Sequence, residues 1–115
     1  PNLKRYPCLK LARDALTQGG SAPLAFNASN EIAVDAFRLN RIGFLEISDI
    51  IEHTLNKMSH AQPNSLDELL ATDSYARRLS SDRVDFNEPY FLSEIERILP
   101  DVILGGSRIH SALEG

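Results

Sequence analysis

Residues 27–34 read Asn27-Ala28-Ser29-Asn30-Glu31-Ile32-Ala33-Val34, and this stretch decides the fold of the 115-residue chain. A helix over about 21–39 gathers its polar side chains into one narrow strip made by Asn27, Glu31, Asp35 and Arg38. Nearly all of the remaining circumference is apolar, and several of its residues are small. A helix that is apolar on most sides is enclosed by its neighbours, so we predict the central helix of a bundle here.

Two further helices flank this stretch. The first is predicted over 7–18, where one apolar stripe is formed by Cys8, Leu11, Ala12, Ala15 and Leu16. Pro7 suits a first helical turn, and Gly19-Gly20 supplies the left-handed residue that commonly ends a helix. The other helix is predicted over about 46–58, after a short connector, with one face formed by Ile47, Ile50, Ile51, Thr54 and Met58.

Shorter helices are predicted after residue 64. Ser65 and Glu68 have the spacing of a capping box, in which each side chain accepts a hydrogen bond from a free N–H group of the first turn. This box opens a short helix that contains Leu66, Leu69 and Leu70. Asp73 can cap a further helix that continues to Leu79.

The last third of the chain differs from the rest in charge. Residues 1–83 carry ten acidic and ten basic side chains, whereas residues 84–115 carry six acidic and two basic ones, which gives the net charge of −4. Pro89 can open an amphipathic helix over about 89–99, and residues 102–106 are either a strand or an extended docking segment.

We therefore predict an all-α fold. It is a small bundle of about four helices over residues 1–83, followed by an acidic tail over residues 84–115 that contains one additional C-terminal amphipathic helix.

Composition limits the classes of function. The neutral body and acidic tail lack the clustered Lys and Arg of a nucleic-acid interface. No apolar run approaches the length of a membrane span, and no signal peptide precedes the first helix. The single cysteine, Cys8, has core spacing and is typical of a protein in the reducing cytoplasm. Because the first residue is proline and not methionine, we expect a piece of a longer chain.

Catalytic chemistry finds little support in the sequence. The histidines His53, His60 and His110 are too far apart for a metal motif, and no P-loop or dinucleotide-binding glycine pattern occurs. A phosphate-binding turn at 105–107, Gly105-Gly106-Ser107, stays open as a weaker alternative. We assign no catalytic, cofactor-binding or metal-binding residue to this chain.

One polar constellation is notable. Asn27, Asn30 and Glu31 are spaced i, i+3 and i+4 on the central helix, and Asn30 falls inside the apolar arc. Such a group is either a substrate or cofactor contact, or a hydrogen-bond cluster that fixes the helix against a neighbouring domain. No positive charge or metal ligand accompanies it, which favours the structural interpretation.

The chain resembles the C-terminal region of the 1-deoxy-D-xylulose 5-phosphate reductoisomerase family over about residues 5–79. The resembling stretches are Arg5-Tyr6-Pro7-Cys8-Leu9-Lys10-Leu11-Ala12, the central stretch quoted above, Arg41-Ile42-Gly43-Phe44, and Ser65 to Arg78. Leu45 departs from the family, which usually has a Thr or Ser able to cap the third helix there. Residues 80–115 show no resemblance.

The resemblance implies an enzyme that converts 1-deoxy-D-xylulose 5-phosphate to 2-C-methyl-D-erythritol 4-phosphate in isoprenoid biosynthesis. It also implies NADPH and a divalent metal (Mg or Mn) as cofactors, a homodimer, and further domains of the same enzyme as partners. Those domains hold the cofactor and metal residues, so this chain is expected to give structural support and to be inactive alone. The alternative is a stand-alone helical interaction module.

Overall fold

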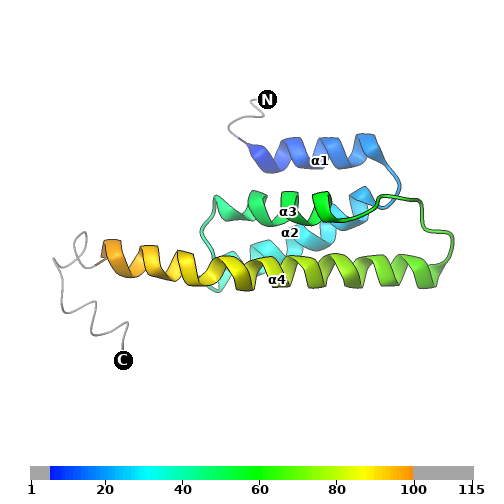
Figure 1. Ribbon diagram of the computed structural model, residues 1–115. Coiled ribbons are helices and arrows are strands. Elements are labelled where there is room, and N and C mark those ends of the chain that lie inside the picture. Colours follow the sequence, from blue (N-terminus) through cyan, green and yellow to red (C-terminus); the bar gives the residue numbers. More distant parts are fainter. Residues whose placement is uncertain (1–5, 100–115) are drawn as a thin grey trace.

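The computed structural model describes residues 6–99, and four helices make up nearly all of this part of the chain. They are α1 (Pro7–Gln18), α2 (Ala22–Arg38), α3 (Glu46–Lys57) and α4 (Leu66–Leu99). Figure 1 shows α1, α3 and α4 stacked beside one another with α2 behind α3. The predicted all-α fold is confirmed, because no strand occurs within residues 6–99.

Helix α2 is the central helix, as predicted, since it packs against each of the other three. Its buried face consists of small side chains only, namely Ala22, Ala25, Ala28, Ser29, Ala33 and Ala36. Small side chains let neighbouring backbones approach closely. The hydroxyl of Ser29 is satisfied within the helix, because it donates to the carbonyl of Ala25 at 2.8 Å. The predicted polar strip lies in solvent.

The larger core residues come from α3 and its neighbours. The predicted face of α3 is buried in full, at Ile47, Ile50, Ile51 and Thr54, with Met58 directly after the helix. The three isoleucines pack against Ala33, Ala36, Ile42 and Val84, whereas Met58 packs against Ala25, Ala28 and Ala76. The isoleucines therefore fill the space that the small residues of α2 leave open.

Helix α3 begins at Glu46 without a capping side chain at Leu45. The carboxylate of Glu46 instead accepts a hydrogen bond from the N–H of Gly43 at 3.1 Å. The N–H groups of Glu46 and Ile47 donate to the carbonyls of Gly43 and Phe44 at 3.1 and 3.2 Å, so two N–H groups of the first turn are satisfied without a cap at Leu45 and the helix starts where predicted.

Helix α4 corrects the prediction of separate helical segments. The structure joins the stretches around Leu66–Leu70, Asp73–Leu79 and 89–99 into one helix of 34 residues. Pro89 lies inside this helix and does not open it. An interior proline removes one backbone hydrogen bond, at a cost of about 3 kcal/mol, but Val84 is buried in the core and anchors the helix on the N-terminal side of the proline.

Of the two hydrogen bonds predicted for the capping box at the start of α4, one is confirmed and the other has a different donor. The Ser65 hydroxyl accepts from the N–H of Glu68 at 3.1 Å. The Glu68 carboxylate, however, accepts from the N–H of Asn64 at 2.6 Å and not from that of Ser65. Asp73 caps no helix of its own, because it lies within α4.

The charge break at residue 84 falls in the middle of α4, so it coincides with no helix end. The division of the chain into parts 1–83 and 84–115 stays a prediction. Residues 102–106 and His110 lie outside the described residues.

The corner between α1 and α2 is built from two glycines with positive φ, Gly19 at 70° and Gly20 at 57°. The N–H of Gly19 donates to the carbonyl of Ala15 at 3.0 Å, which ends α1 as predicted. A Cβ at Gly20 would collide with the backbone carbonyl of His60, in the loop between α3 and α4. Close backbone contact thus joins the two corners of the bundle.

We expect Gly20→Ala to destabilise the fold more than Gly19→Ala. A Cβ at Gly19 meets no atom within 4 Å. The free energy of unfolding of Gly19→Ala should therefore fall only by the strain of the backbone conformation with positive φ, about 1–3 kcal/mol. The free energy of unfolding of Gly20→Ala should fall by a further amount of about 1–3 kcal/mol, because the His60 carbonyl must move to make room for the Cβ. Urea unfolding of both variants measures the difference, and equal losses would contradict this close contact.

Candidate functional site

The three residues predicted to form a polar cluster, Asn27, Asn30 and Glu31, differ in their surroundings on α2. Asn27 and Glu31 are exposed on α2, whereas Asn30 is half-buried. Glu31 accepts a hydrogen bond from the guanidinium of Arg77 on α4 at 3.0 Å. Within residues 6–99, no hydrogen bond joins Asn27, Asn30 and Glu31 to one another. Their role as one structural cluster stays a prediction.

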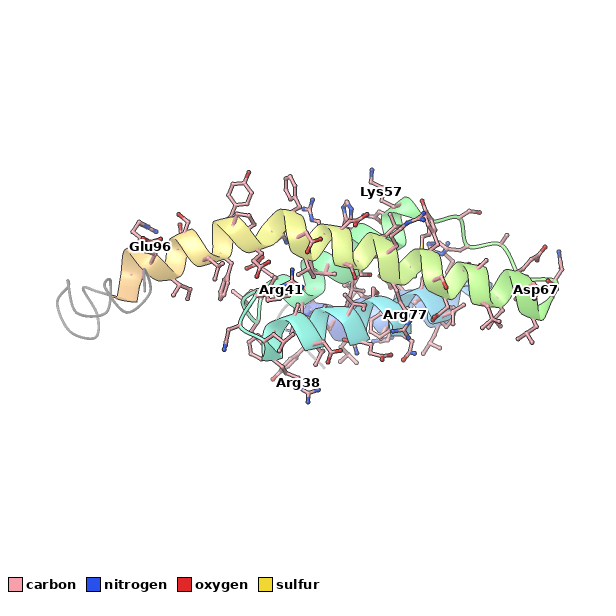
Figure 2. All side chains as sticks on the ribbon, turned by 90° about the horizontal axis from the view of Figure 1, so that it is seen from below. Arg38, Arg41, Lys57, Asp67, Arg77 and Glu96 are labelled. Carbon is pink, nitrogen blue, oxygen red and sulfur yellow. The ribbon has the colours of Figure 1, made fainter. Side chains whose placement is uncertain are left out.

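Arg77 connects α2 to α4. Its Nη2 atom donates to Glu31, and its Nε donates to Asp73 at 2.9 Å, one turn earlier on α4. These contacts raise the pKa of the guanidinium, the bond to Glu31 being the larger cause. Arg77 is labelled in Figure 2, where it lies between α4 and α2. Because the pair is largely exposed, it fixes orientation more than it adds stability.

Asn30 faces a cavity of about 280 Å³ between α1, α2 and the start of α3. The cavity is mostly apolar and is lined by Tyr6, Pro7, Cys8, Asn30, Val34, Phe44, Leu45, Ile47 and Ser48. Partial burial raises the pKa of the Cys8 thiol, which favours the neutral thiol over the nucleophilic thiolate. The predicted packing role of Cys8 agrees with this environment.

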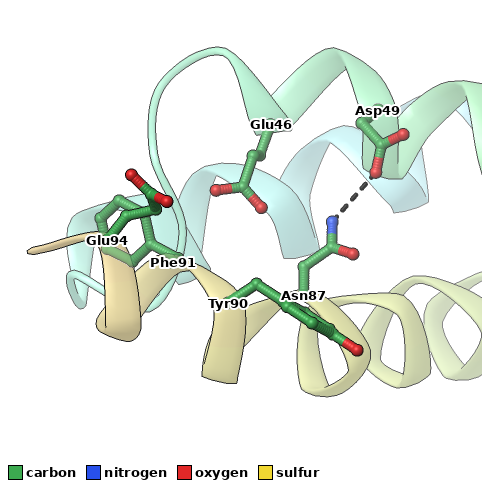
Figure 3. A pocket seen from close by; sticks show the side chains of 6 residues that line it. All are labelled: Glu46, Asp49, Asn87, Tyr90, Phe91 and Glu94. Atoms are coloured by element: carbon green, nitrogen blue, oxygen red, sulfur yellow. Dashed lines mark hydrogen bonds between the residues drawn. The ribbon is translucent and has the colours of Figure 1, made fainter.

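A second cavity, of about 330 Å³, lies between α3 and the C-terminal half of α4 (Figure 3). Three carboxylates line it, and each is already engaged. Asp49 accepts from the Asn87 amide at 2.9 Å, Glu46 accepts from Gly43, and Glu94 accepts from Arg97 at 2.6 Å. Burial raises the pKa of Asp49, but the bonds from Asn87 and Arg83 outweigh it and lower that pKa overall.

A third groove also lies between α3 and α4, nearer to the end of α3 and the N-terminal half of α4, and is lined by His53, Lys57, Tyr75, Leu79, Asp82, Arg83 and Phe86. Partial burial lowers the pKa of His53, and the charges of Arg83 and Lys57 lower it further. His53 is therefore neutral at pH 7. Within residues 6–99, no three His, Cys, Asp or Glu side chains are grouped so that they could hold a metal ion.

Comparison with known proteins identifies the bundle. Residues 1–79 match the family model described as DXP reductoisomerase C-terminal domain. The chain belongs to this family. The match covers α1, α2, α3 and the N-terminal part of α4.

Two curated relatives show the extent of the similarity. The 1-deoxy-D-xylulose 5-phosphate reductoisomerase of Burkholderia vietnamiensis is 48% identical over 81 residues, which are 70% of this chain and 20% of the relative. That of Rhodospirillum centenum is 48% identical over 84 residues, or 73% of this chain and 21% of the relative. The chain thus spans about a fifth of the length of these relatives.

A solved structure agrees with the sequence comparison. The 1-deoxy-D-xylulose 5-phosphate reductoisomerase of Zymomonas mobilis, in complex with NADPH, is 42% identical and superposes with a TM-score of 0.69. The superposition covers 73% of this chain and 22% of that one. The resemblance inferred from the sequence is confirmed.

The contacts of α4 beyond the family match were not foreseen. Arg41, in the connector between α2 and α3, forms a paired hydrogen bond with Glu88, from Nε at 3.1 Å and from Nη2 at 2.9 Å. It also donates to Asp85 at 2.7 Å. The partners lie 44 and 47 residues along the chain, so no local sequence signal reveals them.

None of the helices described here, over residues 6–99, has an apolar stretch that is long enough for it to cross a membrane.

We expect the contribution of Glu88 to stability to depend on pH. The hydrogen bond from Arg41 lowers the pKa of Glu88 below its ordinary value of 4.5, which outweighs the opposing effect of desolvation. A lowered pKa in the folded state stabilises the fold above pH 4.5, and this contribution is lost as the pH falls through the folded-state pKa. Glu88→Gln should therefore lower the thermal midpoint at pH 7 and have little effect near pH 3.

Thermal unfolding followed by circular dichroism measures both midpoints. Asp82→Asn is a control at an exposed carboxylate on the same helix, outside the contacts of Arg41, and should show a smaller difference at pH 7. A pH-independent effect of Glu88→Gln would contradict the role of this ion pair.

Proposed function

We propose that this chain supports the active site of a 1-deoxy-D-xylulose 5-phosphate reductoisomerase as its C-terminal helical domain and takes no part in the chemistry itself. The observation that carries this proposal is the match of residues 1–79 to the C-terminal domain family, together with the superposition on 22% of the Zymomonas mobilis enzyme. The partners are the remaining domains of the same enzyme, in a homodimer located in the cytoplasm.

The cofactors of the whole enzyme belong to those other domains in this proposal. The resemblance implies NADPH and a divalent metal, Mg or Mn. In the second cavity, between α3 and the C-terminal half of α4, the carboxylates of Glu46, Asp49 and Glu94 already accept hydrogen bonds from N–H donors, so they do not fit a metal ion. The described side chains instead supply apolar surfaces and short ion pairs, which position one helix against another.

A hybrid enzyme tests the supporting role. The full 115-residue chain replaces the matching part of the Zymomonas mobilis enzyme, and NADPH oxidation is followed with 1-deoxy-D-xylulose 5-phosphate and Mg²⁺. We expect turnover by the hybrid, because the bundle restores the missing support, and no turnover by the chain alone. The matched control is the same enzyme truncated before this domain, which should be inactive. Turnover by the chain alone, or a hybrid no more active than the truncated control, would contradict the proposal.

The packing of α4 favours a second candidate, a self-sufficient interaction module without enzymatic activity. Val84 is 1% exposed in the core, and Arg41 is held by Asp85 and Glu88. Val84, Asp85 and Glu88 lie beyond the family match, so the part of α4 outside the match contributes both core packing and an ion pair to the bundle.

Truncation tests the second candidate. A chain of residues 1–99 should keep the stability of the full chain, whereas a chain of residues 1–81 should lose at least about 2 kcal/mol, because burial of Val84 alone is worth roughly that amount. Urea unfolding gives the two free energies, and circular dichroism checks that both chains are helical. If both truncated chains are as stable as the full chain, the C-terminal half of α4 does not make the module self-sufficient.

A further inference from the structure

We propose that the cavity around Asn30 is the docking site for an uncharged, apolar segment from the remaining part of the same reductoisomerase. The proposal rests on the proposed function, since it takes the other domains of the enzyme as the partner. It assigns them a particular surface of this chain, formed by the start of α1, the middle of α2 and the connector before α3.

The rim of the cavity is apolar and open to solvent. Leu45 is 83% exposed and Phe44 is 68% exposed, although both are large hydrophobic side chains. Phe44 is held in place by an edge-to-face contact with Phe37, at 5.7 Å between ring centroids. Two large, exposed apolar side chains beside a cavity mark a surface that gains stability when it is covered.

The polar content of the cavity indicates what covers it. Among the described residues, no Asp, Glu, Lys, Arg or His side chain lines this cavity. A charged segment would be desolvated there without compensation, so the occupant must be uncharged. The Asn30 carboxamide is half-buried and forms no hydrogen bond with another residue of the described part.

A carboxamide has both donors and an acceptor, and it therefore pairs well with a main-chain peptide group. Covering the cavity with a polypeptide would bury the amide and satisfy it at the same time, whereas a purely hydrocarbon ligand would leave it unpaired. An apolar polypeptide segment is thus the occupant that can both cover the apolar side chains of the rim and form hydrogen bonds with the Asn30 carboxamide.

The position of the cavity favours a segment of the same enzyme. Tyr6, Pro7 and Cys8 line the cavity, so the polypeptide enters the bundle at its edge. The curated relatives carry most of their length outside the matched part, since that part is 20% of the Burkholderia vietnamiensis enzyme. We therefore take that remaining length as the source of the covering segment.

Cys8 provides the experimental probe, because it is the only cysteine of the chain and lies in the cavity wall. Alkylation of Cys8 by iodoacetamide is measured by mass spectrometry of its peptide, in the 115-residue chain and in the hybrid enzyme described above. We expect alkylation to be at least about tenfold slower in the hybrid, which corresponds to ~1.4 kcal/mol in favour of the docked state.

A pair of matched variants tests whether docking uses this rim. Leu45→Glu places a charge at the rim and should restore rapid alkylation in the hybrid. Leu66→Glu makes the same change at a leucine that is 70% exposed at the start of α4, and should leave Cys8 protected. Both leucines are exposed, so neither variant is expected to unfold the bundle, and circular dichroism verifies this.

The outcomes separate this inference from the proposed function. An active hybrid in which Cys8 is alkylated as fast as in the isolated chain would overturn the docking site and leave the proposed function standing. A protected Cys8 in an inactive hybrid would support the docking site and overturn the supporting role in catalysis. Equal effects of Leu45→Glu and Leu66→Glu on the alkylation of Cys8 would also overturn the docking site. Protection of Cys8 in the isolated chain at high concentration would overturn it as well, because a second copy of the chain would then cover the cavity.

Discussion

The close approach of three helices to the small-residue face of α2 is the constraint on which the structure depends. Alanines and Ser29 cover this face, so the neighbouring backbones come near and leave little room for side chains between them. The corner at Gly20 follows from the same constraint, because it must pass the carbonyl of His60 without a Cβ. Bulk is supplied instead by α3, whose isoleucines are fully buried beside α2.

Polar groups inside this packing are satisfied locally. The hydroxyls of Thr54 and Ser80 lie 2.9 Å apart, and each also lies within donating distance of the carbonyl one turn earlier on its own helix. Because each hydroxyl has one hydrogen, only two of these three contacts carry a hydrogen bond at any moment. At the periphery, Arg77 and Arg41 attach α4 to α2 and to the following connector. These ion pairs fix the direction of a helix whose middle section is already held by buried contacts.

Local features of the fold were predictable from the sequence, and long-range ones were not. The end of α1 at Gly19, the buried face of α3 and the serine half of the capping box depend on neighbours within a few residues. The continuity of α4 depends on Val84 reaching the core, which the sequence around Pro89 does not reveal. The spacing of Asn27, Asn30 and Glu31 predicted one cluster, but only Asn30 faces the cavity.

Two surfaces beside the connector between α2 and α3 differ in the contacts that the described residues supply to them. At the connector before α3, the acidic residues of α4 neutralise Arg41, so part of the negative charge of the C-terminal third serves an internal contact. The wall beside Asn30, which also includes Phe44 and Leu45 of this connector, is lined by no Asp, Glu, Lys, Arg or His side chain among the described residues. The two exposed apolar side chains beside this wall cost free energy in water, whereas the half-buried Asn30 amide still reaches solvent. Covering this face with a further polypeptide segment would remove that cost, which is the physical basis of the docking site proposed above.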